Sequence, residues 1–356
     1  MDQRLFSKTS LLLTASFSLL IVMTKALPHI GSHKAIKTFK LYSRANRYAP
    51  VVLHYQNKKD TLDYAQFERR KPLIFLVHGW MDDGDALWVL ELKDALLNAE
   101  DCNVIIVDWR REARRIYPIA VAKAALVGRR ASRLLQRLVQ RYPDTVGPEL
   151  VHVVGFSLGA QIAGFFARNY RRRTKQRIWR ITALDPAAPE FAGKAVCVHQ
   201  GDARFVDVIH TSGGKEIIKG HLGIDRPVGD VDFYPNGGKD QPGCTTLFKK
   251  VFAKLYPCHH MRAPLLFLES IRNKICRFVS KPCEGGYQAL RAGQCNSTGE
   301  PGLMGFYSYT AHGRGVQTLD TNSKPAYCKK QSPIVGQLDL SNRGRPEAKL
   351  SIQKMP

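Results

Sequence analysis

Short runs of apolar residues, each separated from the next by a segment with helical spacing, restrict the possible folds of this chain more than any other feature. The runs cover residues 73–77, 104–107, 150–154, 178–184 and 205–209. They are too short for helices and are apolar through most of their length, so we expect strands that are buried on both faces. Segments 81–97, 119–142 and 158–170 have helical spacing and fall between them. This alternation predicts an α/β fold with a mostly parallel central sheet and helices on both faces.

The rest of the chain shows no linker or repeat. Gly- and Pro-rich segments over residues 213–243 and 285–305 are expected to be long loops within the same domain. We therefore expect a single α/β domain.

The first residues of the chain have the order of a secretory signal peptide. Arg4 and Lys8 precede an apolar stretch from Leu11 to Met23, and small residues follow up to Ala26. A membrane anchor is the alternative, but this stretch of 13 residues is shorter than the roughly 20 needed to cross a bilayer. We expect residues 1–26 to be a signal peptide, and residues 27–356 to form a secreted, extracellular domain.

Cysteine usage agrees with an oxidising compartment. An even number of cysteines follows the signal peptide, which favours disulfides in a secreted chain. They are Cys102, Cys197, Cys244, Cys258, Cys276, Cys283, Cys295 and Cys328. No Cys-x-x-Cys pair occurs, so we expect no metal site. Asn296 begins an N-glycosylation acceptor, Asn296-Ser297-Thr298, which predicts a surface loop.

The motif Gly155-Phe156-Ser157-Leu158-Gly159 stands between a predicted strand and a predicted helix. Small residues at its two Gly positions allow a strained turn that presents the Ser157 hydroxyl as a nucleophile. The N–H of Leu158 would then face a developing oxyanion. A merely structural turn is the alternative, but the strand and helix on either side favour the nucleophile.

A serine nucleophile of this kind needs an acid, a base and a second oxyanion donor. Asp185 ends the strand that follows the nucleophile helix, at the same edge of the sheet. His260 comes later in the chain, as the order Ser, Asp, His requires, although spacing alone does not separate it from His259. The amide of Trp80, at the end of the first predicted strand, is the candidate second donor. This chemistry needs no cofactor.

Seven sequence blocks now show a family resemblance. They are residues 77–80, 107–109, 155–160, 183–187, 208–211, 232–238 and 258–262. In this order they resemble the successive blocks of the pancreatic lipase family, over about residues 51–308. The resemblance implies an α/β-hydrolase fold and hydrolysis of lipid esters, with Ser157 as nucleophile, Asp185 as acid and His260 as base. Of the adjacent histidines, only His260 stands two residues after Cys258 and two before Arg262, as in the family.

The resemblance also implies two disulfides, Cys244–Cys258 and Cys283–Cys295, the first of which would close off a lid. Apolar residues recur at helical spacing within this segment, opposite lysines, which indicates a basic amphipathic helix. They are Leu247, Phe248, Val251, Phe252 and Leu255. An ordinary surface helix is the alternative. So short a lid resembles the phospholipase A1 members of the family, so a phospholipid substrate is favoured over a glyceride.

Two features depart from the family pattern. The chain ends about 50 residues after the stretch of resemblance, which closes near residue 308, so the C-terminal β-sandwich, and with it colipase binding, is not expected. Between residues 192 and 204 only Asp202 is a carboxylate, so we expect no calcium ion.

A non-catalytic lipid-binding protein with a lipase fold is the other alternative to an enzyme. The presence of Ser157, Asp185 and His260 favours the enzyme.

The chain is strongly basic, with 54 Lys and Arg against 30 Asp and Glu. Residues 110–141 contain ten basic residues and one acid, and a second basic cluster spans 168–177. Such a surface attracts anionic membranes or heparan sulfate. A merely solvated face is the alternative. No nucleic-acid recognition motif accompanies the charge, so we expect no nucleic acid partner.

Overall fold

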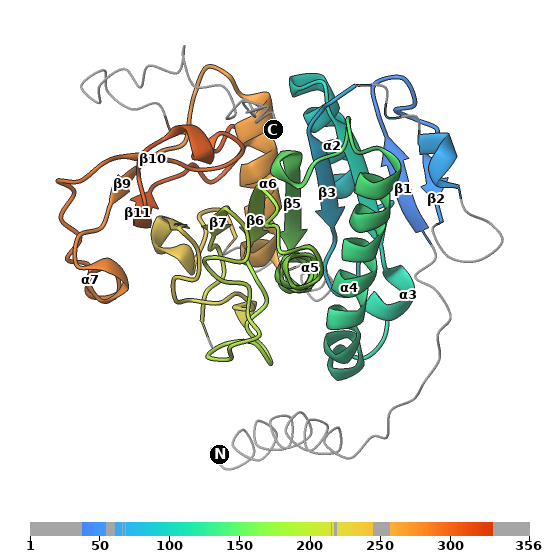
Figure 1. The fold of residues 1–356 in the computed structure, drawn as a ribbon. Helices are drawn as coiled ribbons and strands as arrows, with labels where there is room; N and C mark the ends of the chain where they lie inside the picture. The colour runs from blue at the N-terminus through green and yellow to red at the C-terminus, as the bar shows by residue number, and fades with distance from the viewer. Residues whose placement is uncertain are drawn as a thin grey trace, which may run out of the picture.

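A computed structural model describes residues 38–54, 61–65, 67, 69–214, 216, 219–244 and 257–329. Within them the strands form one 11-stranded sheet, in the order β10-β9-β11-β8-β7-β6-β5-β3-β4-β1-β2 (Figure 1). The strands are β1 Thr38–Tyr42, β2 Val51–Leu53, β3 Leu73–Val77, β4 Asn103–Asp108, β5 Val151–Phe156, β6 Arg180–Leu184, β7 Phe205–Ile209, β8 Val231–Pro235, β9 Val279–Pro282, β10 Gly302–Leu303 and β11 Gly315–Leu319.

The centre of the sheet is parallel, from β4 through β3, β5, β6, β7 and β8 to β11. Its two margins are antiparallel: β1 and β2 lie at one edge, and β9 and β10 at the other. The prediction of a mostly parallel sheet is confirmed. The apolar runs at 73–77 and 205–209 coincide with β3 and β7, and the other three overlap β4, β5 and β6.

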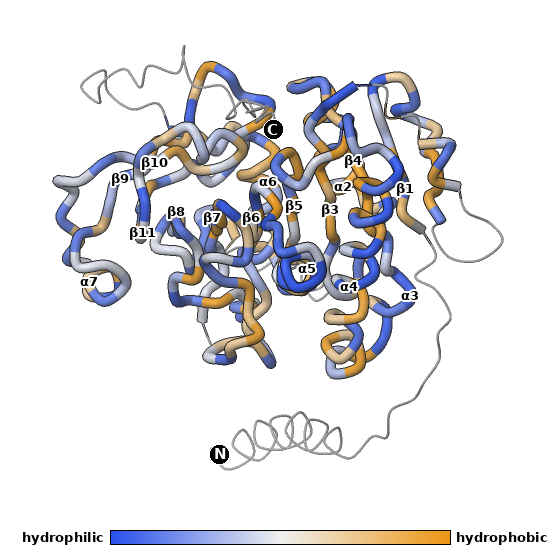
Figure 2. Tube along the Cα trace, viewed as in Figure 1, coloured by the Kyte–Doolittle hydropathy of each residue, from blue (hydrophilic) through white to orange (hydrophobic). Residues whose placement is uncertain are grey.

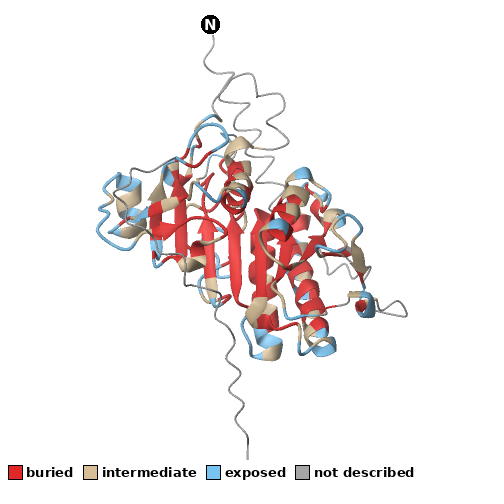
Figure 3. Cartoon of the chain, turned by 90° about the horizontal axis from the view of Figure 1, so that it is seen from above, coloured by how far each residue is buried: buried red, intermediate tan, exposed pale blue. Residues whose placement is uncertain are grey.

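Helices cover both faces of the sheet because successive side chains of each strand point to opposite sides. On β3, Leu73, Phe75 and Val77 belong to the core that contains α4 (Tyr117–Arg141) and α5 (Leu158–Thr174). Ile74 and Leu76 belong to the core beneath α2 (Leu87–Ala99) and α6 (Cys258–Arg272). Both sets are buried, which explains why the strand has no polar alternation (Figure 3).

Three predicted segments are wrong: one helix begins later than expected, and two expected loops contain regular elements. The helix expected over 81–97 begins only at Leu87, because Met81 has a left-handed φ of 59° and Asp82 is buried in a loop. The expected loop over 213–243 contains β8, which is fully buried but carries the polar residue Asp232 and so lacks an apolar signal. The expected loop over 285–305 contains β10 and the short helix α7 (Gly286–Ala292), which buries no residue and so shows no periodicity.

Six of the eight cysteines form disulfides. Cys244–Cys258 and Cys283–Cys295 are the two pairs that the family resemblance implies. The third pair, Cys276–Cys328, joins the segment after α6 to the segment after β11. Cys102 and Cys197 are buried and take part in none of the three disulfides.

Several predicted features lie outside the described residues. They are the signal peptide at 1–26 and the lid residues Leu247, Phe248, Val251, Phe252 and Leu255. In the part of the chain that is described, no helix is both long and apolar enough to cross a membrane. Asn296 is exposed, beside the Cys283–Cys295 disulfide, as expected for an acceptor in a surface loop.

Candidate active site

Ser157 lies at the turn between β5 and α5. Its backbone has φ 57° and ψ −122°, a conformation that is strained for a residue with a side chain. The turn is fixed on both sides, because the Ser157 N–H donates to the Leu184 carbonyl at 2.9 Å and the Ser157 carbonyl accepts from the Ala187 N–H at 3.2 Å. The sequence-predicted turn from strand to serine to helix is therefore present.

The two glycines of the motif allow this turn to form. A Cβ at Gly155 would lie 2.3 Å from the Gly159 carbonyl oxygen, and a Cβ at Gly159 would lie 2.2 Å from the Val77 carbonyl oxygen. Both distances are too short for any side chain. Only glycine lets the first turn of α5 pack directly against β5 and β3, which places Ser157 at the end of the central strands.

Asp185 follows β6 and is fully buried. Its Oδ1 accepts from the Thr211 N–H at 2.8 Å and the Ser212 N–H at 3.1 Å, and its Oδ2 accepts from the Ser212 hydroxyl. Burial alone would raise the pKa of Asp185, but hydrogen bonds from His260, Ser212 and Thr211 outweigh it and hold the pKa below the usual range. The side chain is therefore a stable carboxylate.

A neighbouring loop closes over this carboxylate. The Gly223 N–H donates to the Ser212 carbonyl at 3.1 Å, and a Cβ at Gly223 would lie 2.3 Å from Asp185 Oδ1. Sequence reasoning missed both Ser212 and Gly223. Ser212 could have been found from its position after β7, because neighbouring parallel strands end at the same edge of the sheet. Nothing in the sequence indicates Gly223.

His260 lies in the first turn of α6 and faces Asp185. Its Nδ1 is 2.5 Å from Asp185 Oδ2, and its ring centroid is 4.6 Å from that of Phe156. Pro264 has no N–H to donate to the His260 carbonyl four residues earlier, and the Thr211 hydroxyl, at 3.5 Å, donates to that carbonyl instead. Contacts to the ring and to the backbone carbonyl of His260 therefore orient its imidazole.

The contact with Asp185 determines which ring nitrogen is basic. Because Nδ1 faces a carboxylate, it carries the proton, and Nε2 keeps its lone pair. Nε2 is buried and makes no hydrogen bond within the described residues, including none to the Ser157 hydroxyl. In substrate-free enzymes of this kind the serine–histidine bond is commonly long and shortens when substrate binds. His260 Nε2 can thus act as a base next to the segment Phe156-Ser157.

The other two histidines near the site make different contacts. His259 Nδ1 accepts from the Gln241 N–H at 2.8 Å, and burial lowers the pKa of His259. His210 is held between the Ile224 carbonyl and the Asp232 carboxylate, each at 2.8 Å. Neither contacts Asp185, so the structure places His260 rather than His259 beside the acid.

The two candidate oxyanion donors lie on either side of Ser157. Leu158 is the first residue of α5, and Trp80 belongs to the loop after β3. A Cβ at Gly79 would lie 3.1 Å from the Ser157 Cβ, so this loop runs directly against the serine. Within the described residues neither the Trp80 nor the Leu158 N–H donates a hydrogen bond. Both amides are available to an oxyanion.

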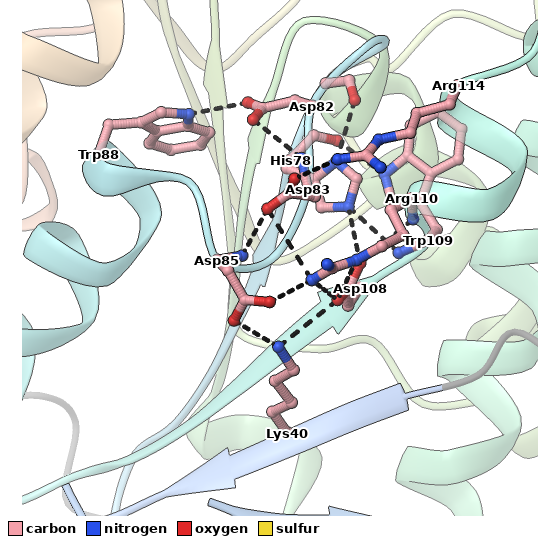
Figure 4. A network of polar contacts seen from close by, with 11 residues as sticks. Lys40, His78, Asp82, Asp83, Asp85, Trp88, Asp108, Trp109, Arg110 and Arg114 are labelled. Carbon is pink, nitrogen blue, oxygen red and sulfur yellow. Dashed lines mark hydrogen bonds and ion pairs between the residues drawn. The ribbon is translucent and has the colours of Figure 1, made fainter. Parts of the chain in front are cut away.

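His78 and Trp109 hold the loop in place (Figure 4). The Trp109 N–H donates to His78 Nε2 at 3.1 Å and the Trp109 indole donates to the His78 carbonyl at 2.8 Å, with the rings stacked at 12°. Since Nε2 accepts, Nδ1 carries the proton that is donated to the Gly79 carbonyl at 3.0 Å. The fully buried His78 therefore supports the loop.

Charged side chains surround the same loop (Figure 4). Lys40 contacts Asp85 at 2.5 Å, and Arg110 contacts Asp108 at 2.8 Å. Burial would raise the pKa of Asp108, but the hydrogen bonds that it accepts from the Arg110 side chain and N–H lower it well below its usual range. The loop is thus tied to β1, β4 and α3 (Arg110–Ala113) by ionised groups.

Asp82 differs from these neighbours. It is buried and accepts from the Trp88 indole at 2.8 Å and the Asp83 N–H at 2.9 Å. Burial raises the pKa of Asp82 despite the opposing effects of His78 and Trp88. Because Trp88 belongs to the first turn of α2, its hydrogen bond to Asp82 joins the loop to that helix.

Asp202, the one carboxylate between residues 192 and 204, is buried and contacts an arginine. Asp202 accepts from the Arg168 guanidinium at 2.5 Å and from the His199 N–H at 3.1 Å. Across the described ranges, no group of three His, Cys, Asp or Glu side chains is arranged to hold a metal ion. The Asp202 charge is balanced by an arginine.

A strained serine after a central strand, an acid after the next strand along and a later histidine, all on a mostly parallel sheet, define an α/β-hydrolase. The chain belongs to the lipase family, whose family model matches residues 22–327.

Several curated relatives share about a third of their aligned residues with this chain. Rabbit (Oryctolagus cuniculus) lipase member H is 33% identical over 307 residues, 81% of this chain and 63% of the relative. Rabbit hepatic triacylglycerol lipase is 36% identical, with 72% of this chain and 54% of the relative covered. Rat (Rattus norvegicus) pancreatic lipase-related protein 2 is 34% identical, with 74% and 57% covered. The chain thus spans less than two thirds of the length of these relatives.

Among solved structures, esterase PE8 aligns with 40% of this chain and 69% of its own, at 22% identity and a TM-score of 0.29.

Proposed function

We propose that this protein is a secreted lipid carboxyl-ester hydrolase of the phospholipase A1 type. The observation that carries this proposal is the contact between His260 Nδ1 and Asp185 Oδ2 at 2.5 Å, which leaves Nε2 as the basic nitrogen of a ring that packs against Phe156, the residue before the strained Ser157. Membership of the lipase family supports the lipid substrate.

The mechanism follows from these positions. His260 Nε2 takes the Ser157 proton as the hydroxyl attacks the ester carbonyl, while Asp185 holds the tautomer and stabilises the imidazolium. The N–H groups of Trp80 and Leu158 stabilise the tetrahedral oxyanion. The protonated His260 then donates to the leaving alcohol, and water, activated by the same imidazole, releases the fatty acid from the acyl-enzyme.

The substrate class rests on the lid. The Cys244–Cys258 disulfide encloses only 13 residues, and so short a segment resembles the phospholipase A1 members of the family. Similarity to a hepatic triacylglycerol lipase favours the alternative, a triacylglycerol substrate. A non-catalytic lipid-binding role is disfavoured because Ser157, Asp185 and His260 are all present.

Covalent labelling tests whether the protein is an enzyme. An organophosphonate ester should label the wild type once, at Ser157, and Ser157→Ala should abolish both labelling and hydrolysis of a soluble short-chain ester. Ser323→Ala, at an exposed serine, is the matched control and should retain both. A folded wild type that resists labelling would leave only the binding role.

Substrate preference needs a separate comparison. Phosphatidylcholine vesicles with different sn-1 and sn-2 chains, and a triacylglycerol emulsion, are offered at equal interfacial area. We expect release of the sn-1 chain from the vesicles to be faster. Faster hydrolysis of the emulsion would identify a triacylglycerol lipase.

Secretion is supported by the three disulfides. When the chain is expressed in a secreting eukaryotic cell, the protein recovered from the culture medium should begin at Leu27. Its mass should fall on treatment with an N-glycosidase, and Asn296→Gln should remove that change.

A further inference from the structure

The helix that contains His260 begins without a side-chain cap. Residues such as Ser or Asp before a helix commonly accept from its first N–H groups, but Pro257 precedes α6 and makes no such bond. Pro264 also leaves the His260 carbonyl without its partner in the helix. Apolar residues of α6 pack in the same core as β5 and β6, beside which the helix lies (Figure 2). The orientation of its first turn therefore depends on polar contacts with other segments.

The segment that ends at Cys244 lies along this first turn and contacts it in two ways. A disulfide joins Cys244 to Cys258, and the Gln241 N–H donates to His259 Nδ1 at 2.8 Å. The disulfide keeps the two segments together, whereas the hydrogen bond fixes the orientation of the His259 side chain. Because His259 is joined to His260 by a peptide bond, this hydrogen bond acts on the backbone of the proposed base.

The same hydrogen bond belongs to a closed network around the base and the acid. Gln241 is buried, and its side-chain amide donates to the Thr211 carbonyl at 3.1 Å. The Thr211 hydroxyl donates to the His260 carbonyl at 3.5 Å, and the Thr211 N–H donates to Asp185 Oδ1 at 2.8 Å. These bonds and the peptide bond between His259 and His260 close the network. It connects the backbone of the proposed base to the turn that binds the proposed acid.

We propose that His259 is a positioning residue for His260, and that its unprotonated Nδ1 is the group that acts. The inference rests on the function proposed above, because it assigns His260 as the base. An imidazole nitrogen accepts a hydrogen bond only through its lone pair. In neutral His259 the proton therefore lies on Nε2, which faces Asp240 Oδ1 at 3.8 Å. A proton added at Nδ1 would oppose the Gln241 N–H and open the network.

The surroundings of His259 determine the pH at which this happens. Facing groups are Asp240, His221, Arg262 and Asp185, and Glu216 and Lys239 lie beyond His221. Burial lowers the pKa of His259, the nearby His221 and Arg262 lower it further, and the two aspartates oppose them. Since the net effect is a pKa below the ordinary histidine value, Nδ1 is an acceptor at neutral pH and loses this role on acidification.

Two substitutions at this position separate the acceptor from the rest of the side chain. His259→Asn keeps an oxygen in place of Nδ1 and does not titrate, whereas His259→Leu removes the acceptor. At about pH 8 the Asn variant should keep kcat/KM for a soluble ester within about twofold, and the Leu variant should lose at least about fivefold, the order expected for one hydrogen bond. The loss should be in kcat at constant KM. The Cys244–Cys258 disulfide should keep the Leu variant folded.

The pH profile provides a readout that a purely structural role would not change. His260 titrates in both the wild type and His259→Asn, so its effect cancels in the ratio of their kcat/KM values. This ratio, variant over wild type, should rise from about one at about pH 8 to at least about five at about pH 5. His54→Asn is the control, at an exposed histidine that follows the edge strand β2, and its ratio should stay constant.

Each outcome decides the inference. A ratio for His259→Asn that does not change with pH would overturn it, and so would wild-type kcat in folded His259→Leu. If His259→Leu does not fold, the pH ratio of His259→Asn still decides. A wild type that neither hydrolyses the ester nor reacts with the organophosphonate would refute the proposed function and this inference with it, whereas an active wild type with a constant ratio would refute this inference alone.

Discussion

Replacement of Gly223 by alanine would disturb Asp185, the proposed catalytic acid, without removing any proposed catalytic group. The new Cβ would lie 2.3 Å from Asp185 Oδ1, whereas ordinary contacts begin at 3.4 Å. The carboxylate, or the loop, must therefore move by about 3.4 − 2.3 = 1.1 Å. Gly223 is not among the residues with positive φ, so its backbone accepts alanine without conformational strain.

A shift of this size should affect catalysis more than stability. Misplacement of a catalytic group by about 1 Å can cost a factor of about 10² in rate, which corresponds to about 2.7 kcal/mol in the activation free energy. We expect kcat/KM for a soluble ester to fall about 100-fold. Overpacking should lower the free energy of unfolding by about 1–3 kcal/mol, which the fold should survive.

The assay measures ester hydrolysis, the rate of organophosphonate labelling and the unfolding temperature together. Labelling should slow in parallel with hydrolysis, because both need Ser157 activated through His260. Gly299→Ala is the control, because its Cβ would meet Pro282 at an ordinary 3.4 Å. Wild-type kcat/KM in folded Gly223→Ala would refute the view that the Asp185 position limits the rate.

Three further outcomes follow from the described contacts. Asp185→Asn should lower kcat by about 10⁴, because the amide favours the wrong imidazole tautomer; retention of a tenth of wild-type kcat would contradict this. The folded-state pKa values of Asp185 and Asp108 are lowered, so their contribution to stability is present above the ordinary carboxyl range and is lost as the pH falls through the folded values. The unfolding temperature should therefore drop steeply below about pH 4, and a smaller drop in Asp108→Asn is the check. Changing both Cys276 and Cys328, which are 52 residues apart, to alanine should cost about 4 kcal/mol of unfolding free energy, measured in urea; an unchanged midpoint would exclude that disulfide as a stabilising cross-link.

The central strands and the serine turn could be predicted from the sequence because each depends on local pattern. A strand such as β3 is buried on both faces, so all of its residues are apolar. At Ser157, the glycines and the flanking elements together specify the turn. The identity of the base required more than pattern, since His259 and His260 are adjacent, and the family resemblance distinguished them.

Polar residues inside the core could not be predicted in this way. Arg180 lies in an otherwise apolar run, yet it is fully buried and binds Asp207 through two parallel hydrogen bonds at 2.7 and 2.8 Å. It also donates to the Phe306 carbonyl at 2.6 Å and the Gly305 carbonyl at 2.9 Å. Such a pair is tolerated only when every donor is satisfied, and the partners are 125 and 126 residues away. The same holds for Gly223, whose role depends on a contact between loops.

The basic residues between positions 110 and 141 have two different roles in the folded chain. They form one continuous basic stretch in the sequence, but their side chains make different contacts in the structure. Near Ser157, Arg110 and Arg114 contact Asp83 and Asp108 and so hold the loop after β3, which contains Trp80. Further along the same stretch, the arginines of α4 have no acidic residue on their own helix or on α5. Charge that is neutralised locally contributes to the position of the loop, whereas charge that is left unpaired contributes to the external field. Removal of the first kind should therefore lower kcat/KM for a soluble ester, and removal of the second kind should leave it unchanged.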